Sequence, residues 1–135
     1  WAYHGLACLY LKSDPEKAKQ FIMEGMALQR ERLSYQKEVF KILEKCGAYK
    51  EIDEEYKKQT AENQKNGRIQ YYYVAALEKL ERNEEAYHLL NDGDGIDVSD
   101  IREGDSDIQS IWESLHEKVY GEKGHLPHYY NFKVN

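Results

Sequence analysis

The sequence predicts an all-α protein in which helical hairpins repeat every 34 residues. Shifting the 135-residue chain against itself by 34 positions aligns apolar residues in columns without a gap. Some columns lie four residues apart, which is one turn on one face of a helix. A fixed period of this length is typical of repeats built from helix pairs. The columns are Leu6, Phe40 and Val74; Cys8, Ile42 and Ala76; Leu9, Leu43 and Leu77; Ala18, Ile52 and Ala86; and Ile22, Tyr56 and Leu90.

The first repeat predicts helices over residues 1–11 and 15–29. Asp14 can cap the second of these helices, and Pro15 suits its first position, where no backbone N–H is needed. The first helix is apolar from Trp1 onward. Since helical repeats bury their cores only against neighbouring repeats, we expect earlier repeats of a longer protein to cover this helix.

The second and third repeats predict four more helices, over residues 32–46, 49–65, 68–81 and 84–91. Asn66 and Gly67 are expected to end the helix over 49–65, because Gly is favoured just past a helix end. Residues 1–93 therefore form the repeat region, with the first repeat truncated.

Residues 94–135 predict an acidic loop, one further helix and an extended strap. Ser106 to Gln109 match a capping box, and apolar residues then recur at helical spacing up to Val119. This predicts a helix over 106–120, ended by Gly121 and Gly124. We expect it to cap the last repeat, with the aromatic-rich segment 126–132 as a strap.

The repeat resembles the tetratricopeptide repeat, whose period is 34 residues. The segment from Gly47 to Ile52 is similar to the turn between the two helices of that family, and Leu80 to Ala86 is a degenerate copy. The resemblance covers residues 1 to about 93, close to three repeats. It implies a right-handed α-solenoid that binds proteins or peptides.

The tail resembles a second, more specific group. Residues 100–105, Trp112, Pro127 and Phe132 are similar to the carboxyl-terminal end of bacterial proteins of unknown function. In those proteins, a β-sandwich domain related to sugar-active folds precedes tetratricopeptide-like repeats. The resemblance implies a cytoplasmic protein linked to carbohydrate metabolism, with any sugar chemistry outside these 135 residues.

Charge and composition exclude several classes of protein. The net charge is −6, and the acidic surplus lies in residues 92–107, which hold seven of the 25 acids and one of the 19 bases. A nucleic-acid binder or an anionic-membrane anchor needs a basic face, so neither partner is expected. No apolar run approaches the roughly 18 to 20 residues that cross a bilayer, which predicts a soluble protein. Cys8 and Cys46 fall in core columns, and we expect buried, reduced thiols.

The sequence offers only incomplete motifs for chemistry. Asp92, Asp94 and Asp97 invite a calcium site, but Ile96 and Asp97 stand where an EF-hand needs an acid and a glycine. His116, His125 and His128 could bind zinc, although surface histidines are the simpler interpretation. No phosphate loop or dinucleotide pattern is present, and no metal, cofactor or catalytic residue is expected.

Aromatic and basic residues in the first helices give the candidate binding surface. Tyr71 aligns with Tyr3 and Lys37, in the column that lines the concave groove of tetratricopeptide proteins. The predicted surface comprises Tyr3, Tyr10, Lys37, Lys41 and Tyr71. The alternative is that these tyrosines pack between adjacent helices.

These observations predict a non-catalytic scaffold or protein-interaction module of a larger protein. We expect a protein or peptide partner, the amino-terminal domain of the same protein, or oligomerisation through the exposed first helix. The alternative function is an accessory part of a carbohydrate-active enzyme, in which the acidic tail contributes to a sugar site on another domain.

Overall fold

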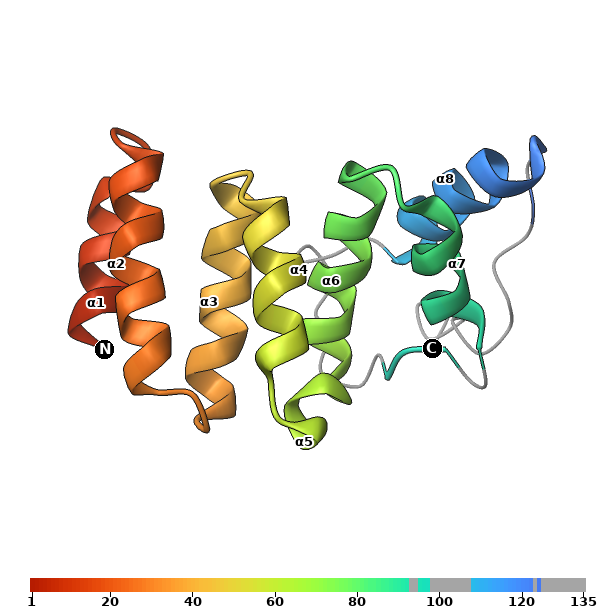
Figure 1. Ribbon diagram of the computed structural model, residues 1–135. Coiled ribbons are helices and arrows are strands. Elements are labelled where there is room, and N and C mark those ends of the chain that lie inside the picture. Colours follow the sequence, from red (N-terminus) through yellow and green to blue (C-terminus); the bar gives the residue numbers. More distant parts are fainter. Residues whose placement is uncertain (93–94, 98–107, 123, 125–135) are drawn as a thin grey trace, which may run out of the picture. The chain divides into compact units, whose positions relative to one another are not determined.

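The computed structural model describes residues 1–92, 95–97, 108–122 and 124, and the regular elements in this part are helices joined by short turns and loops (Figure 1). Within these residues no strand is present, which confirms the predicted all-α class. None of the described helices is long and apolar enough to cross a membrane. The chain forms two compact units, residues 1–64 and residues 65–135, which are described separately below.

The first unit begins with a helical hairpin of α1 (Ala2–Tyr10) and α2 (Pro15–Leu28). Asp14 caps α2 as predicted: its carboxylate accepts a hydrogen bond from the Lys17 amide at 3.2 Å. The aromatic rings of Tyr10 and Phe21 stack with centroids 5.8 Å apart and hold the two helices together.

The second hairpin differs from the prediction, because the helix expected over 49–65 is broken. The hairpin begins with α3 (Leu33–Lys45). In place of one helix over 49–65, the structure has α4 (Tyr49–Lys58) and the short α5 (Ala61–Gln64). The chain is extended at Gln59, and the Thr60 hydroxyl accepts a hydrogen bond from the Asn63 amide at 3.1 Å. The Tyr56 hydroxyl also donates to the Gln64 carbonyl at 3.1 Å, which folds α5 back onto α4.

A chain of buried amide side chains explains the break. The Gln36 side chain donates to the Gln29 backbone carbonyl at 2.8 Å. The Gln59 side chain donates to Gln36 Oε1 at 2.9 Å, and the Asn63 side chain donates to Gln59 Oε1 at 3.1 Å. Gln36, Gln59 and Asn63 are all buried. A buried amide is costly unless it is hydrogen-bonded, so leaving the helix at Gln59 allows its side chain to reach Gln36.

The second unit contains α6 (Gly67–Lys79), α7 (Asn83–Asn91) and α8 (Ile108–Tyr120). The expectation that Asn66 and Gly67 end the preceding helix is wrong. Asn66 instead caps α6, accepting hydrogen bonds from the amides of Arg68 and Ile69, both at 3.1 Å. Gly67 is the first residue of α6, and this position needs a glycine because the Asp97 carbonyl occupies the space that a Cβ would need.

The helix predicted over 106–120 is present as α8 from Ile108 onward, and residues 106 and 107 lie outside the described part. It packs on α7 through aromatic side chains. The Trp112 indole donates to the Asn91 side chain at 2.9 Å and stacks on His116, with ring centroids 4.9 Å apart. Tyr87 is hydrogen-bonded to His116 Nδ1 at 3.0 Å.

Gly121 follows α8 with a positive φ of 75°, as expected of a helix-ending glycine. The predicted strap over residues 126–132 lies outside the described residues, as do residues 123 and 125 on either side of Gly124.

Two turns between paired helices have the same backbone at an interval of 34 residues. After α3, Gly47 has a φ of 69° and the Ala48 amide bonds to the Leu43 carbonyl at 2.9 Å. After α6, Glu81 has a φ of 63° and the Arg82 amide bonds to the Leu77 carbonyl at 2.9 Å. The sequence period is therefore also a structural period in these turns.

Candidate functional site

The outer face of α1 is the most distinctive surface of the first unit. Residues 2, 5, 6 and 9 share one face of the helix, because successive helical residues are about 100° apart. These residues are exposed, Leu6 by 38% and Leu9 by 71%. No acidic residue, lysine or arginine occurs between Trp1 and Leu11, although one third of the chain is charged. We define the α1 face as Ala2, Gly5, Leu6 and Leu9.

Besides Leu6 and Leu9, two other large apolar side chains of the first hairpin are exposed among the described residues. Among the described residues, all the exposed large hydrophobic side chains lie in the first hairpin except Tyr120 of α8. Trp1 is 53% exposed at the start of α1, and Leu28 is 70% exposed at the end of α2. Leu28 lies on a different helix, whereas Leu6 and Leu9 share one face of α1. Contiguous exposed apolar surface marks interaction sites more often than single exposed residues do.

The opposite side of α1 is fixed on α2 and α3. Ala7 is fully buried, and the Trp1 ring packs on buried Tyr35 with centroids 5.0 Å apart. His4 Nε2 lies 3.3 Å from a Glu38 carboxylate oxygen on α3. These contacts hold α1 in one orientation, so its outward face is presented by a positioned helix.

Exposure of the α1 face follows from the number of neighbouring helices. Figure 1 shows α1 beside α2 at one edge of the first unit, whereas α3 contacts α1 and α2 on one side and α4 on the other. The residues of α3 that stand 34 positions after the α1 face are all buried; they are Gln36, Val39, Phe40 and Leu43. Leu6 and Leu9 therefore belong to apolar columns that are buried only where a further helix covers them.

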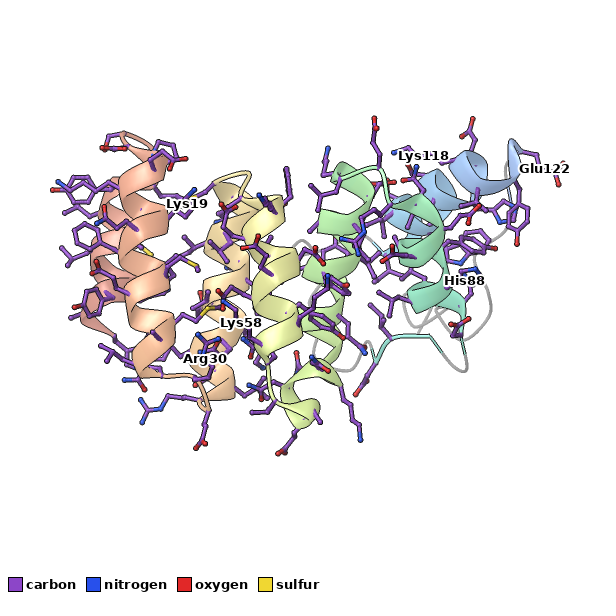
Figure 2. The ribbon with its side chains drawn as sticks, viewed as in Figure 1. Lys19, Arg30, Lys58, His88, Lys118 and Glu122 are labelled. Carbon is purple, nitrogen blue, oxygen red and sulfur yellow. The ribbon has the colours of Figure 1, made fainter. Side chains whose placement is uncertain are left out.

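Two ion pairs join the two hairpins of the first unit. Lys19 of α2 lies 3.3 Å from Glu51, and Arg30 lies 3.0 Å from the buried carboxylate of Glu55. Figure 2 shows the long side chains of Lys19 and Arg30 at this contact. The pKa of Lys19 is raised, mainly by its hydrogen bond to Glu16. Burial lowers this pKa, and the interaction with Glu51 raises it further. The charge-free α1 face differs clearly from this contact.

The expectation of two buried thiols is wrong for Cys8. Cys8 is exposed on α1, with its sulfur 3.8 Å from His4 Nε2, because no described helix covers this side of α1. Cys46 is half-buried at the end of α3. Burial raises the pKa of the Cys46 thiol, and the nearby carboxylate of Glu16 raises it further. Cys46 therefore stays protonated at neutral pH.

The five residues of the predicted binding surface lie in both units. In the first unit, Tyr3 lies against α2, where a Cβ on Gly25 would stand 2.8 Å from the Tyr3 Cβ. Tyr10 stacks on Phe21 and also carries the Lys17 ammonium 4.4 Å above its ring. These contacts fit the alternative that the two tyrosines pack between helices.

The other three residues of that surface are half-buried. Lys37 and Lys41 lie one turn apart on α3. Tyr71 belongs to the second unit, where its ring meets that of Tyr72 edge-on at 5.7 Å. That the five side chains line a single groove stays a prediction.

No group of three or more potential metal ligands occurs among the described residues. Asp92 and Asp97 are both exposed, and Asp92 lies 3.7 Å from His88 Nδ1. Asp94 lies outside the described residues, as do His125 and His128 of the considered zinc set. Most of the acidic segment 92–107 lies outside them too, so its predicted role stays a prediction.

Three comparisons with known proteins give no further assignment. No model of a known family matches the chain, and neither curated proteins nor solved structures give a match. The α1 face must therefore be interpreted from its own chemistry. The absence of charge from α1 is evident in the sequence, but the exposure of Ala2 and Gly5 beside Leu9 was not predicted. A helical projection of residues 1–11 would have placed Ala2, Gly5 and Leu9 on one face.

Proposed function

We propose that the chain is a non-catalytic interaction module that binds an apolar α-helix of a protein partner on the α1 face. The single observation that carries this proposal is the exposure of a charge-free apolar face on a helix whose other side is fixed. Such a face favours a helix as partner, because ridges of side chains on two helices interlock along their length.

We also propose that the fold is a right-handed solenoid similar to the tetratricopeptide repeat. The matching turns at Gly47 and Glu81 support a structural period of 34 residues. Burial of the aligned residues Ala18, Ile52 and Ala86 also supports it. In such an array every helix pair covers the apolar face of the next, so a helix that no neighbouring pair covers exposes this face.

The energetics favour occupation of this face. Fully burying a leucine side chain contributes roughly 1.5 to 3 kcal/mol. Leu6 and Leu9 are already held on an ordered helix, so little further ordering of α1 opposes binding. No acidic, lysine or arginine side chain of α1 has to lose its hydration shell, because the helix contains none.

The proposal is tested by supplying a helical hairpin in register. A variant that carries an additional copy of residues 1–34 directly before Trp1 keeps the 34-residue period. Its added second helix can then pack on the original α1. We expect a higher thermal midpoint, because the original Leu6 and Leu9 become buried.

The matched control is the same duplicated protein with Leu6→Glu and Leu9→Glu in the original α1 only. The added hairpin is then expected to give no stabilisation, since packing would bury two carboxylates. Equal midpoints for the duplicated protein and its control would contradict the proposal. So would a duplicated protein that melts no higher than the 135-residue chain.

A further inference from the structure

We propose that the partner of the α1 face is a second copy of this chain, bound as an antiparallel pair of α1 helices about a two-fold axis. This inference rests on the proposed function and names the helix that is bound. In a two-fold contact the same surface serves both copies, and each residue near the axis faces its own counterpart or one close to it. The face must therefore be complementary to itself.

The charge distribution of α1 meets this requirement. A lysine or glutamate near a two-fold axis would face the same charge on the other copy, and like charges at an interface oppose binding. The segment from Trp1 to Leu11 has no such residue. Other exposed helix faces of the first unit carry charges, for example Glu54, Lys57 and Lys58 on α4.

The shape of the α1 face meets it as well. Leu9 protrudes from the helix and is 71% exposed. Gly5, one turn earlier on the same face, has no side chain, and a Cβ placed on it would have open space around it. A two-fold axis at the level of Ala7 places Leu9 of each copy opposite Gly5 of the other. Each copy thus offers one protrusion and one recess at the spacing that an antiparallel pair needs.

The size of the contact sets the expected affinity. The nine residues of α1 give a helix about 14 Å long at 1.5 Å per residue. A helix pair of this length buries less than the roughly 800 Å² per partner of a standard interface. We therefore expect a reversible dimer with a Kd on the order of 10 to 100 μM.

Sedimentation velocity of the 135-residue protein over roughly 5 to 500 μM tests this. We expect a shift from monomer to dimer across that range. Leu9→Glu should weaken the dimer at least tenfold. It should leave the far-ultraviolet circular dichroism unchanged, because the Leu9 side chain is 71% exposed and contributes little to the stability of the fold. Leu28→Glu is the matched control, since Leu28 is as exposed as Leu9 but lies on α2, and it should leave the dimer unchanged.

A swap of the protrusion and the recess tests the two-fold geometry itself. Gly5→Leu should weaken the dimer about tenfold, because it fills the recess that receives Leu9. The double variant Gly5→Leu with Leu9→Ala should restore the dimer, because protrusion and recess have exchanged places in both copies. Non-specific apolar association would instead be strengthened by Gly5→Leu.

Three results would overturn the inference: a monomer at 500 μM, stronger association of Gly5→Leu, or equal weakening by Leu28→Glu and Leu9→Glu. None of them decides the proposed function, which the duplicated protein tests in a single polypeptide. A monomeric chain whose duplicated form is stabilised would reject the second copy and retain helix binding on α1. Failure of both experiments would reject both.

Discussion

The Tyr35 side chain connects all three helices at the amino-terminal end of the first unit. It lies on α3, is almost completely buried, and packs against Trp1 of α1. Its hydroxyl is directed at α2 near Gly25 and has no hydrogen-bond partner among the described residues. An unpaired buried hydroxyl is costly, so the close fit of the ring is what keeps this side chain in place.

Gly25→Ala should destabilise the protein. A Cβ at this position would collide with the Tyr35 hydroxyl and stand 2.8 Å from the Tyr3 Cβ. We expect a net loss of about 1 to 2 kcal/mol in the free energy of unfolding, because overpacking outweighs the better helix propensity of alanine.

Gly5→Ala is the matched control for this glycine, because its new methyl group enters open space. Measured by urea unfolding at low micromolar protein, it should stabilise α1 by about 0.5 to 1 kcal/mol. Equal effects of Gly25→Ala and Gly5→Ala would contradict the packing described around Tyr35.

The protein should lose stability at alkaline pH. Burial raises the pKa of the Tyr35 phenol, with Tyr3 adding to it, and burial also raises the pKa of the Cys46 thiol. Both groups hold their protons more tightly in the folded state than in the unfolded state. Their contribution is therefore complete below about pH 8.5 and falls as the pH rises through the folded-state values.

Chemical denaturation at several pH values between about 7 and 11 measures this loss. Cys46→Ala should flatten the lower part of the decline, and Tyr35→Phe the upper part, where an unfolded phenol ionises near pH 10. Tyr35→Phe should also be neutral or stabilising at pH 7, because it removes an unpaired buried hydroxyl. A pH profile identical in the three proteins would assign the loss to other groups.

At the scale of elements, the turns after α3 and α6 show how the repeat is encoded. Both contain a residue in the left-handed region of backbone space, Gly47 in one turn and Glu81 in the other. Glycine adopts this conformation without steric cost, whereas a residue with a Cβ does not. The turn is therefore imposed at Glu81 by the helices that it joins.

Glu81→Gly should stabilise the protein by about 0.5 to 1 kcal/mol, since it relieves the strain of a positive φ. Gly47→Ala should destabilise it by about 1 kcal/mol through the converse effect. Thermal unfolding of the two variants and the parent protein gives both changes. Destabilisation by Glu81→Gly would show that the two turns are not equivalent.

Most helices could be predicted from the sequence, because apolar periodicity and caps are local signals. Asp14 and Pro15 correctly predicted the start of α2. The break at Gln59 could not be predicted in this way, because it depends on hydrogen bonds between Gln59 and Gln36, 23 residues apart. The role of Gly67 was missed for a similar reason, since it depends on the distant Asp97 carbonyl.

At the scale of the whole molecule, the sequence predicted the candidate site only in part. Absence of charge from Trp1 to Leu11 indicated an apolar helix, and exposure of that helix was expected. The periodicity nevertheless placed Leu6, Cys8 and Leu9 in core columns, and the structure shows all three exposed. Periodicity reports which side chains a complete array would bury, but burial of a given copy depends on whether a neighbouring helix is present.

The central claim is that the α1 face binds a helix, and hydrogen exchange of the α1 amides tests it most directly. The comparison is between the original α1 in the duplicated protein and α1 in the 135-residue chain at low micromolar concentration, where the proposed dimer is not formed. We predict at least tenfold slower exchange of the original α1 amides in the duplicated protein, and no slowing in its Leu6→Glu, Leu9→Glu control. Equal exchange rates in all three proteins would contradict the claim.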